Sequence, residues 1–182
     1  MTGQPRIRRL GSADLESYRP QFIDLYREVY AEPPYLETEE HVAAYVERFA
    51  NESAQPGFAL VVAEIDADLA GYAYGHSFPA DEWWSDADHE PVEVKGRTKF
   101  AVIEWAVRKP YRQQGIGAAL MRTLLAGRPE DFATLCSNPA APARQIYQRW
   151  GWRPVARAYP PGIPPMDVLL LPHQIWEHNL TS

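Results

Sequence analysis

The chain of 182 residues is long enough for one domain with its own hydrophobic core. Its net charge of −6 argues against a nucleic-acid binder, because a surface that tracks phosphates needs clustered cations. The single cysteine excludes an intrachain disulfide, and the N-terminus carries no apolar stretch of the signal-peptide kind. No apolar run approaches the roughly 20 residues that span a bilayer. We therefore expect a soluble cytoplasmic protein with neither nucleic-acid nor membrane partners.

Two helices are expected near the N-terminus, after a short strand at residues 6–10. Apolar residues spaced three, four or seven apart predict the first helix, with Ser12 as its N-cap. Pro20 interrupts this pattern, which predicts a short turn followed by a longer helix. The second helix is expected over residues 38–51, because Thr38 can cap it and two glutamates follow at the positive end of the helix dipole.

A β-hairpin and a long loop follow these helices. Residues 58–65 predict a buried strand, residues 66–68 a tight turn, and residues 69–78 the returning strand. The next stretch, residues 79–99, is polar and unusually long. Long ordered loops inside compact domains are often functional, so we expect this loop to contribute to a site.

Strands and helices alternate in the second half of the chain. The strongest strand covers residues 100–107. The other expected elements are helices at 115–126 and 141–150 and strands at 132–137, 153–159 and 166–171. This order predicts a single α/β domain over residues 1–182, with helices on the faces of one sheet.

A glycine-rich turn, Arg112-Gln113-Gln114-Gly115-Ile116-Gly117, joins the strongest strand to the next helix. Glycines let the backbone turn tightly and approach a ligand closely, and the first N–H groups of a helix carry partial positive charge. A pyrophosphate bound there could accept several N–H donors at once. The P-loop lysine is missing and the spacing does not fit the dinucleotide fingerprint, which disfavours nucleoside triphosphates and nicotinamide dinucleotides. Alternatively, the glycines only allow the tight turn between the strand and the helix and bind no ligand.

Two segments of the chain resemble the GNAT acetyltransferase superfamily. Residues 107–117 are similar to its signature of a strand end, a Pro-Tyr-Arg turn and a glycine-rich helix start, and residues 141–152 resemble its tyrosine-containing helix that ends in a Gly-aromatic pair. The close match covers about residues 100–155. The resemblance implies the GNAT fold, an α/β (α+β) domain with a single mixed, mostly antiparallel sheet of about six or seven strands. That sheet is splayed between strands 4 and 5 and flanked by about four helices.

The resemblance also implies acetyl-coenzyme A as cosubstrate. Backbone N–H groups of the glycine-rich turn would hold the pyrophosphate, and the end of the preceding strand would pair with the pantetheine arm. The implied coenzyme site consists of Trp105, Ala106, Val107, Arg112, Gln113, Gln114, Gly115, Ile116, Gly117, Ala118 and Tyr147. Many family members carry an asparagine seven residues before the tyrosine. Here Ala140 stands at that position and Asn138 lies nearby, which leaves the contacts at this helix start open.

Two residues are candidates for the chemistry of acetyl transfer. Tyr147 stands where many family members carry the tyrosine proposed to protonate the departing thiolate, and a phenol pKa of about 10 suits that task. Glu104 is the candidate base, because a carboxylate in an apolar strand is costly unless paired or functional and desolvation raises its pKa. The alternatives are a tyrosine that only contacts the coenzyme, a glutamate that only orients or attracts the amine, and a base that acts through water. By resemblance, the N–H of Val107 is the oxyanion donor.

Aromatic side chains with acidic neighbours predict where the acceptor binds, because such a surface suits a cationic amine. The candidate residues are Tyr30, Tyr74, His76, Trp83 and Trp84. A set of core and rim aromatics without a binding role is the alternative. The histidines do not match metal-ligand spacing, so no metal is expected.

The sequence thus predicts an N-acetyltransferase that uses acetyl-coenzyme A and a primary amine of a small molecule in one ternary complex. A protein N-terminal or lysine acetyltransferase is the alternative within the same chemistry. A non-catalytic acyl-coenzyme A sensor is the alternative from another class. A homodimer is compatible with the resemblance.

Overall fold

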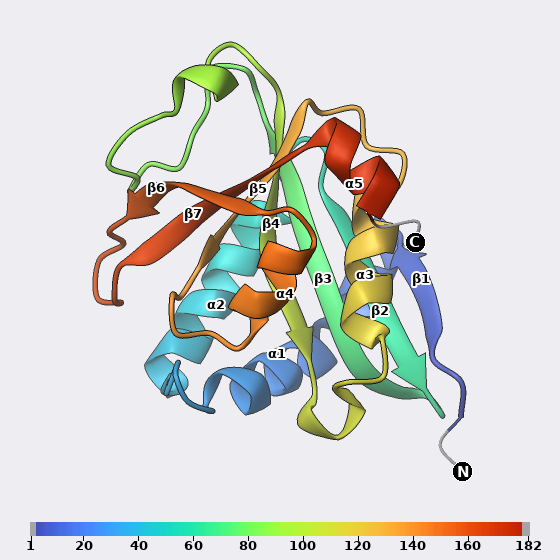
Figure 1. Ribbon diagram of the computed structural model, residues 1–182. Coiled ribbons are helices and arrows are strands. Elements are labelled where there is room, and N and C mark those ends of the chain that lie inside the picture. The colour runs from blue at the N-terminus through green and yellow to red at the C-terminus, as the bar shows by residue number, and fades with distance from the viewer. Residues whose placement is uncertain (1–2, 180–182) are drawn as a thin grey trace. The chain divides into compact units, whose positions relative to one another are not determined.

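The computed structural model describes residues 3–179, with side chains described as far as Trp176 (Figure 1). The strands are β1 (Arg6–Leu10), β2 (Ala59–Ile65), β3 (Asp68–Phe78), β4 (Lys99–Val107), β5 (Phe132–Ser137), β6 (Arg153–Ala158) and β7 (Met166–Pro172). The α-helices are α1 (Leu15–Tyr30), α2 (Glu39–Glu52), α3 (Ile116–Leu125), α4 (Ala143–Arg149) and α5 (His173–Asn179). None of the helices in this part of the chain has the length and apolar character that crossing a membrane requires.

The strands form one seven-stranded sheet in the order β1-β2-β3-β4-β5-β7-β6. The pairs β1–β2, β2–β3, β5–β7 and β6–β7 are antiparallel, whereas β4 and β5 are parallel. The parallel ladder covers only Lys99–Ala101 and Phe132–Thr134, while β5 pairs along its whole length with β7. The expected mixed, mostly antiparallel sheet with a splay after the start of β4 and β5 is therefore confirmed.

Packing divides the chain into two compact units, which are described separately. The first unit comprises Met1–His76 and Glu104–Leu124, and the second comprises Ser77–Ile103 and Leu125–Ser182. Both β3 and β4 contribute residues to each unit. The single domain over residues 1–182 stays a prediction.

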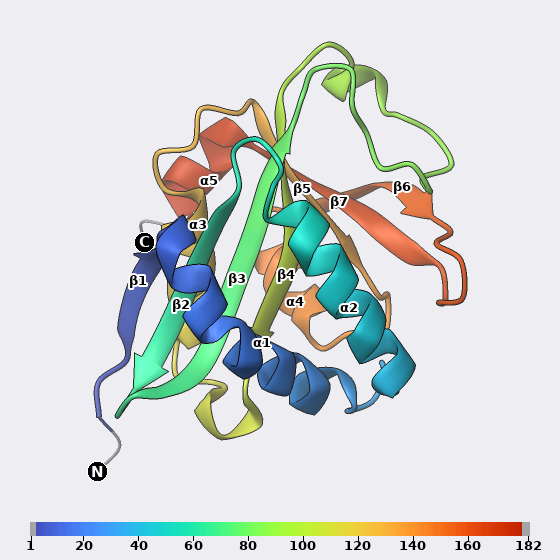
Figure 2. The same cartoon turned by 180° about the vertical axis from the view of Figure 1, so that it is seen from behind.

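Helices cover both faces of the strands in the first unit. Figure 1 shows α3 on one face of β2 and β3, and Figure 2 shows α1 and α2 on the opposite face. Aromatic rings from α1, α2 and β3 form the core on that opposite face, with neighbouring centroids 4.0 to 6.2 Å apart. The members are Phe22, Tyr26, Tyr45, Phe49, Tyr72 and Tyr74. The 3.6-residue pattern of the helices and the two-residue pattern of the strand bring these rings together.

Pro20 does not divide the first helix, contrary to the prediction. α1 is continuous with Pro20 inside it. Pro20 is exposed, so the carbonyl of Glu16 that it leaves without a helical donor can bind water. The buried residues Phe22 and Leu25 hold the following turns on the core. The predicted N-cap Ser12 lies instead in a preceding 3-10 turn, which extends to Asp14, and Asp14 is the residue at the N-cap.

The C-terminal half also differs from the prediction at two places. α4 begins at Ala143, with Pro142 at the N-cap position, two residues later than expected. α5 was not predicted, because its seven residues are too few to show a helical period. The described residues thus contain five α-helices where about four were expected.

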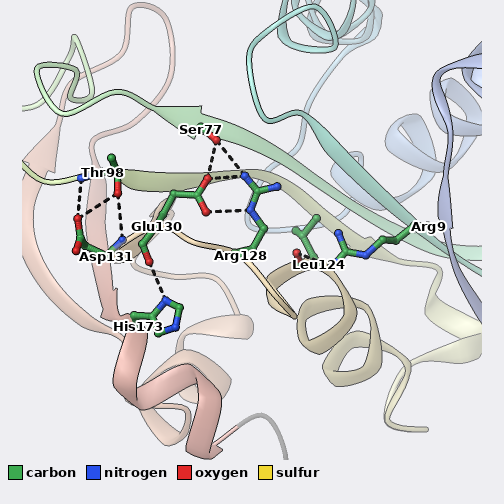
Figure 3. A network of polar contacts seen from close by, with 8 residues as sticks. All are labelled: Arg9, Ser77, Thr98, Leu124, Arg128, Glu130, Asp131 and His173. Carbon is green, nitrogen blue, oxygen red and sulfur yellow. Dashed lines mark hydrogen bonds and ion pairs between the residues drawn. The ribbon is translucent and has the colours of Figure 1, made fainter.

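A buried polar network joins the end of β3, the segment before β5 and the start of α5 in the second unit (Figure 3). The Glu130 carboxylate accepts from Arg128 Nε at 3.0 Å and from the Ser77 hydroxyl at 2.6 Å. The Arg128 side chain is 12% exposed, so its pairing with Glu130 compensates a charge that would be costly alone. His173 Nδ1 donates to the Glu130 carbonyl at 2.8 Å, which attaches the start of α5 to the same network.

Candidate active site

Glu104 lies buried on β4, with both of its carboxylate oxygens hydrogen-bonded. Only 7% of the residue is exposed. The hydroxyl of Tyr30 at the end of α1 donates to Oε2 at 2.6 Å, and Nη2 of Arg48 on α2 donates to Oε1 at 3.0 Å. Side chains alternate along a strand, so Glu104 faces α1 and α2 while Trp105 faces α3. The costly charge on this apolar strand is therefore paired.

Burial raises the pKa of Glu104 from its usual value of 4.5 to about 7. The guanidinium of Arg48 and the hydrogen bond from Tyr30 lower this pKa, and without them burial would raise it further. The nearby carboxylates of Glu52 and Glu37 act in the same direction as burial. A carboxyl with a pKa near neutrality is suited to general base catalysis, because it can both take up and release a proton there.

The turn before α3 has the backbone of an anion-binding nest. Gln113 and Gly115 have positive φ angles of 63° and 79°, and the intervening Gln114 does not. Residues of alternating handedness direct neighbouring N–H groups to one concave side, which suits an anion. The hydrogen bond from the Ala119 N–H to the Gly115 carbonyl, at 3.0 Å, opens α3. Helix geometry therefore leaves the N–H groups of residues 116–118 without helical acceptors.

The two glycines of this turn meet different physical needs. A Cβ at Gly115 would have open space, so its positive φ is the feature that favours glycine. At Gly117 a Cβ would lie 2.8 Å from Cζ2 of Trp105. The indole Nε1–H of Trp105 donates to the Gly117 carbonyl at 3.0 Å. Gly117 thus makes room for the Trp105 ring against the start of α3, a role that was not predicted from the sequence.

The side chains of Arg112 and Gln114 are used within the turn and its surroundings. Arg112 Nε donates to the Val107 carbonyl at 2.8 Å, and its terminal nitrogens pair with Glu32 at 2.8 and 3.2 Å. Gln114 Nε2 donates to the Pro110 carbonyl at 3.1 Å. These contacts fix the shape of the turn.

Tyr147 lies in the second unit, on α4. It is 7% exposed, and its ring meets Trp152 edge-on with centroids 5.9 Å apart. The side-chain oxygen of Asn138 accepts from the Ala140 N–H at 2.9 Å. The Asn138 carbonyl accepts from the Ala141 N–H at 3.0 Å. Asn138 thus closes the turn that leads into α4, two residues before the position where many family members have asparagine.

Both tryptophans of the 79–98 loop hold that loop in place within the second unit. Trp83 Nε1 donates to the His89 carbonyl at 3.0 Å, and Trp84 Nε1 donates to Thr134 Oγ1 at 2.9 Å. The two indole N–H groups are therefore engaged inside the protein. The Trp83 side chain also packs on a buried apolar cluster, and the Trp84 ring meets Phe78 edge-on with centroids 5.1 Å apart.

The other predicted acceptor residues lie in the first unit. Tyr74 is fully buried, and its hydroxyl donates to Glu52 at 2.7 Å. His76 is 7% exposed on the same strand. Of the predicted acceptor residues of this unit, Tyr30 donates a hydrogen bond to Glu104. Among residues 3–179 no group of three His, Cys, Asp or Glu side chains is placed to hold a metal ion.

Arg48 was missed by the sequence analysis. It lies four residues before Glu52 on α2, and its Nε is 3.4 Å from the Glu52 carboxylate. Such an i,i+4 pair in a sequence indicates an exposed ion pair on a helix surface. Only the packing of α2 on the sheet shows that Arg48 also reaches a buried carboxylate on β4.

We expect Thr134→Val to loosen the 79–98 loop. Thr134 is fully buried, accepts from Trp84 and donates to the Leu169 carbonyl at 2.9 Å. The valine would leave both partners unsatisfied, so the free energy of unfolding should fall by about 2 kcal/mol. Urea unfolding followed by tryptophan fluorescence measures this change. A variant as stable as the wild type would show that these hydrogen bonds contribute nothing net.

Comparison with known proteins places the chain in a family. The family model described as "Acetyltransferase (GNAT) family" matches residues 19–152, more than half of the chain. No curated protein matches. The fold is similar to that of PH1933 from Pyrococcus horikoshii OT3, at 22% identity and a TM-score of 0.64, with 93% of this chain and 98% of that chain covered.

Two further solved structures share the fold. NAA60 from Arabidopsis thaliana in complex with acetyl-CoA is 20% identical, with a TM-score of 0.64 and coverage of 93% of this chain and 99% of that chain. The ribosomal-protein-S18-alanine N-acetyltransferase from Escherichia coli is 18% identical, with a TM-score of 0.59 and coverage of 93% and 94%. The family match, with the glycine-rich turn and the splayed sheet, leads to one conclusion: the chain belongs to the GNAT family of acetyltransferases.

Proposed function

We propose that the chain transfers the acetyl group of acetyl-coenzyme A to a primary amine of a small molecule, with both substrates bound in one ternary complex. The observation that carries this proposal is the pairing of a nest-like turn with a buried carboxyl whose pKa is near neutrality, on consecutive segments of one compact unit. Membership of the acetyltransferase family supports it.

The residues of the turn fit the diphosphate of a coenzyme A molecule. The positive φ angles at Gln113 and Gly115 and the unpaired N–H groups at the start of α3 offer several donors to one anion. The macrodipole of α3 adds partial positive charge at the same place. Trp105, Ala106 and Val107 would supply the backbone for the pantetheine arm. The coenzyme, when bound, supplies an activated acetyl thioester.

In the proposed mechanism Glu104 and Tyr147 handle the protons. An amine attacks only when neutral, so Glu104 accepts a proton from the acceptor's ammonium, directly or through water. The N–H of Val107 would stabilise the oxyanion that forms on the carbonyl oxygen of the acetyl group. Tyr147 would donate its phenolic proton to the departing thiolate and later regain one from solvent. The attacking nitrogen loses its second proton to solvent as the tetrahedral intermediate collapses, and Glu104 then releases its proton to solvent. The products are therefore the acceptor amide, the free thiol and one proton.

Acceptor contacts are proposed separately for the two units: Tyr30, Tyr74 and His76 are the candidates in the first, and Trp83 and Trp84 are those in the second. Aromatic rings with neighbouring carboxylates attract amines, and the ordered aromatic loop favours a small acceptor over an extended peptide.

An acceptor screen with acetyl-coenzyme A and detection of the released thiol tests the proposed function. The panel should contain small primary amines, polyamines, aminoglycosides, and peptides with a free N-terminus or a lysine. We expect thiol release that depends on a small amine. Release only with peptides would move the function to protein acetylation, and coenzyme binding without turnover on any acceptor would indicate a sensor.

Tyr147→Phe should lower kcat by roughly 100-fold with little change in the affinity for acetyl-coenzyme A. The phenylalanine keeps the ring against Trp152 but removes the proton donor. Tyr159→Phe is the matched control, because Tyr159 is 57% exposed in the same unit. If kcat were equal in Tyr147→Phe and the wild type, Tyr147 would have no part in protonating the thiolate.

A further inference from the structure

Two side chains from different helices each donate a hydrogen bond to one oxygen of the Glu104 carboxylate. The Tyr30 hydroxyl, from α1, donates to Oε2, and the Arg48 guanidinium, from α2, donates to Oε1. Each oxygen has one donor, so rotation of the carboxylate would break two hydrogen bonds. A charged or charge-assisted hydrogen bond at each oxygen holds the ionised form in one orientation.

The groups that interact with this carboxylate in the described residues are mainly phenols, together with the cation of Arg48. In the first unit Glu104 interacts electrostatically with tyrosines of α1, α2, β3 and the α1–α2 connection, with Arg48, and with two carboxylates. These groups are Tyr26, Tyr30, Tyr35, Tyr45, Tyr72, Tyr74, Arg48, Glu37 and Glu52. The neutral phenols add little charge near pH 7. The charge of Arg48, together with the hydrogen bond from Tyr30, therefore opposes the effect of burial and of the two neighbouring carboxylates on the pKa of Glu104.

A second glutamate of the same unit has the same pair of donors but lies nearer the surface. Tyr18 on α1 donates to Glu64, and Arg8 Nε donates to Glu64 at 3.2 Å. The Glu64 side chain is 18% exposed, against 7% for Glu104. Burial raises the pKa of Glu64, but the hydrogen bonds from Tyr18 and Arg8 outweigh it and leave that pKa below its usual value. In both places the tyrosine and the arginine stabilise the ionised carboxylate. The extent of burial decides whether the pKa of the glutamate ends below its usual value, as for Glu64, or above it, as for Glu104.

We propose that Tyr30 and Arg48 are positioning residues for acetyl transfer, which fix the orientation of the Glu104 carboxylate and stabilise its ionised form through one hydrogen bond to each oxygen. This inference rests on the proposed function, in which Glu104 accepts the proton of the amine. The two residues act through Glu104 and do not themselves take part in proton transfer. This role explains why the half-exposed Arg48 lies next to the buried Glu104. Without either donor the buried carboxyl would hold its proton to a higher pH.

The first test measures kcat/KM against pH for Tyr30→Phe, Arg48→Met and Arg48→Lys with one acceptor. In the wild type the rate should rise through about pH 7. Arg48→Met should move this rise upward by about one pH unit or more, and Tyr30→Phe should move it upward by less. Arg48→Lys keeps the cation and should lie between Arg48→Met and the wild type. All variants should regain rate at high pH, which a merely misfolded protein would not.

Tyr18→Phe and Arg8→Met are the matched controls, because they remove the same two donors from Glu64. Their pH profiles should coincide with that of the wild type. If Tyr30→Phe and Arg48→Met also kept the wild-type profile, the proposal would be wrong. The same conclusion would follow if the control variants moved the profile as much as the test variants.

A second measurement does not require activity. Carbon NMR of protein labelled at the glutamate carboxyl carbon follows the titration of Glu104 directly, with Glu104→Gln to assign its signal. We expect a midpoint near pH 7 in the wild type, a higher one in Tyr30→Phe and Arg48→Met, and no change in the controls. If the acceptor screen failed but these midpoints moved as expected, the proposed function would fall and the positioning of Glu104 would stand. Unmoved midpoints would overturn the positioning itself.

Discussion

Glu104→Gln is expected to lower kcat/KM at pH 8 by roughly 100-fold or more and to abolish the rise of rate through pH 7. Glutamine keeps one oxygen that can accept from Arg48, and its amide N–H can donate to the Tyr30 hydroxyl, but it cannot take up the proton of the amine. Initial rates of thiol release between pH 5.5 and 9.5 measure both effects. Glu64→Gln, at the second tyrosine–arginine pair, is the control and should leave the rate and its pH profile unchanged.

Glu104→Gln is also expected to change how the free energy of unfolding depends on pH. The pKa of Glu104 is raised from 4.5 to about 7 in the folded protein, so between these values the folded state binds more protons than the unfolded state. Stability of the wild type should therefore fall as pH rises through this window, by about 3 kcal/mol in total for this group. Glu104→Gln should lack that part of the slope in urea unfolding. An unaltered rate profile and an unaltered stability slope would both contradict the assignment of Glu104.

Gly115→Ala is expected to weaken the binding of acetyl-coenzyme A by roughly 10-fold or more, because a 1.4 kcal/mol change in binding free energy has that effect. An L-residue at a φ of 79° is strained by about 1–2 kcal/mol. The alanine methyl group itself meets open space. The strain should therefore turn the N–H groups of the nest away from the anion without any clash in the core. Isothermal titration calorimetry measures the affinity.

Gly127→Ala is the matched control for this substitution. Gly127 follows α3, has a φ of 70° and also has open space for a Cβ. Both variants should lose a similar amount of stability, but Gly127→Ala should bind acetyl-coenzyme A as the wild type does. Equal affinities of Gly115→Ala and Gly127→Ala would mean that the conformation of Gly115 does not shape the coenzyme site.

Local sequence signals predicted most of the elements. β1 and β5 have the predicted bounds, and the turn between β2 and β3 lies where residues 66–68 indicated it, with positive φ at Asp66 and Ala67. These features follow from short-range rules, namely strand alternation, turn propensity and helix capping. The position of Glu104 on an apolar strand also marked it as paired or functional before its partners were known.

The features that were not predicted from the sequence depend on packing between distant parts of the chain. Pro20 is tolerated inside α1 because it faces solvent, which a local pattern does not show. Arg48 has the sequence signature of a surface ion pair, yet the packing of α2 brings it to a buried carboxylate. Gly117 has the appearance of a ligand-binding glycine, yet its missing Cβ makes room for Trp105. The partners of Arg48 and Gly117 are distant in the sequence, and the tolerance of Pro20 depends on the direction in which it faces. A local sequence pattern shows neither.

The most direct test of the central claim is calorimetric titration of the folded wild-type protein with acetyl-coenzyme A and, in parallel, with acetyl-pantetheine, which lacks the diphosphate. We expect saturable binding of acetyl-coenzyme A and far weaker binding of acetyl-pantetheine, because the turn at residues 113–118 is proposed to recognise the diphosphate. Absence of any binding of acetyl-coenzyme A, or equal binding of the two ligands, would contradict it.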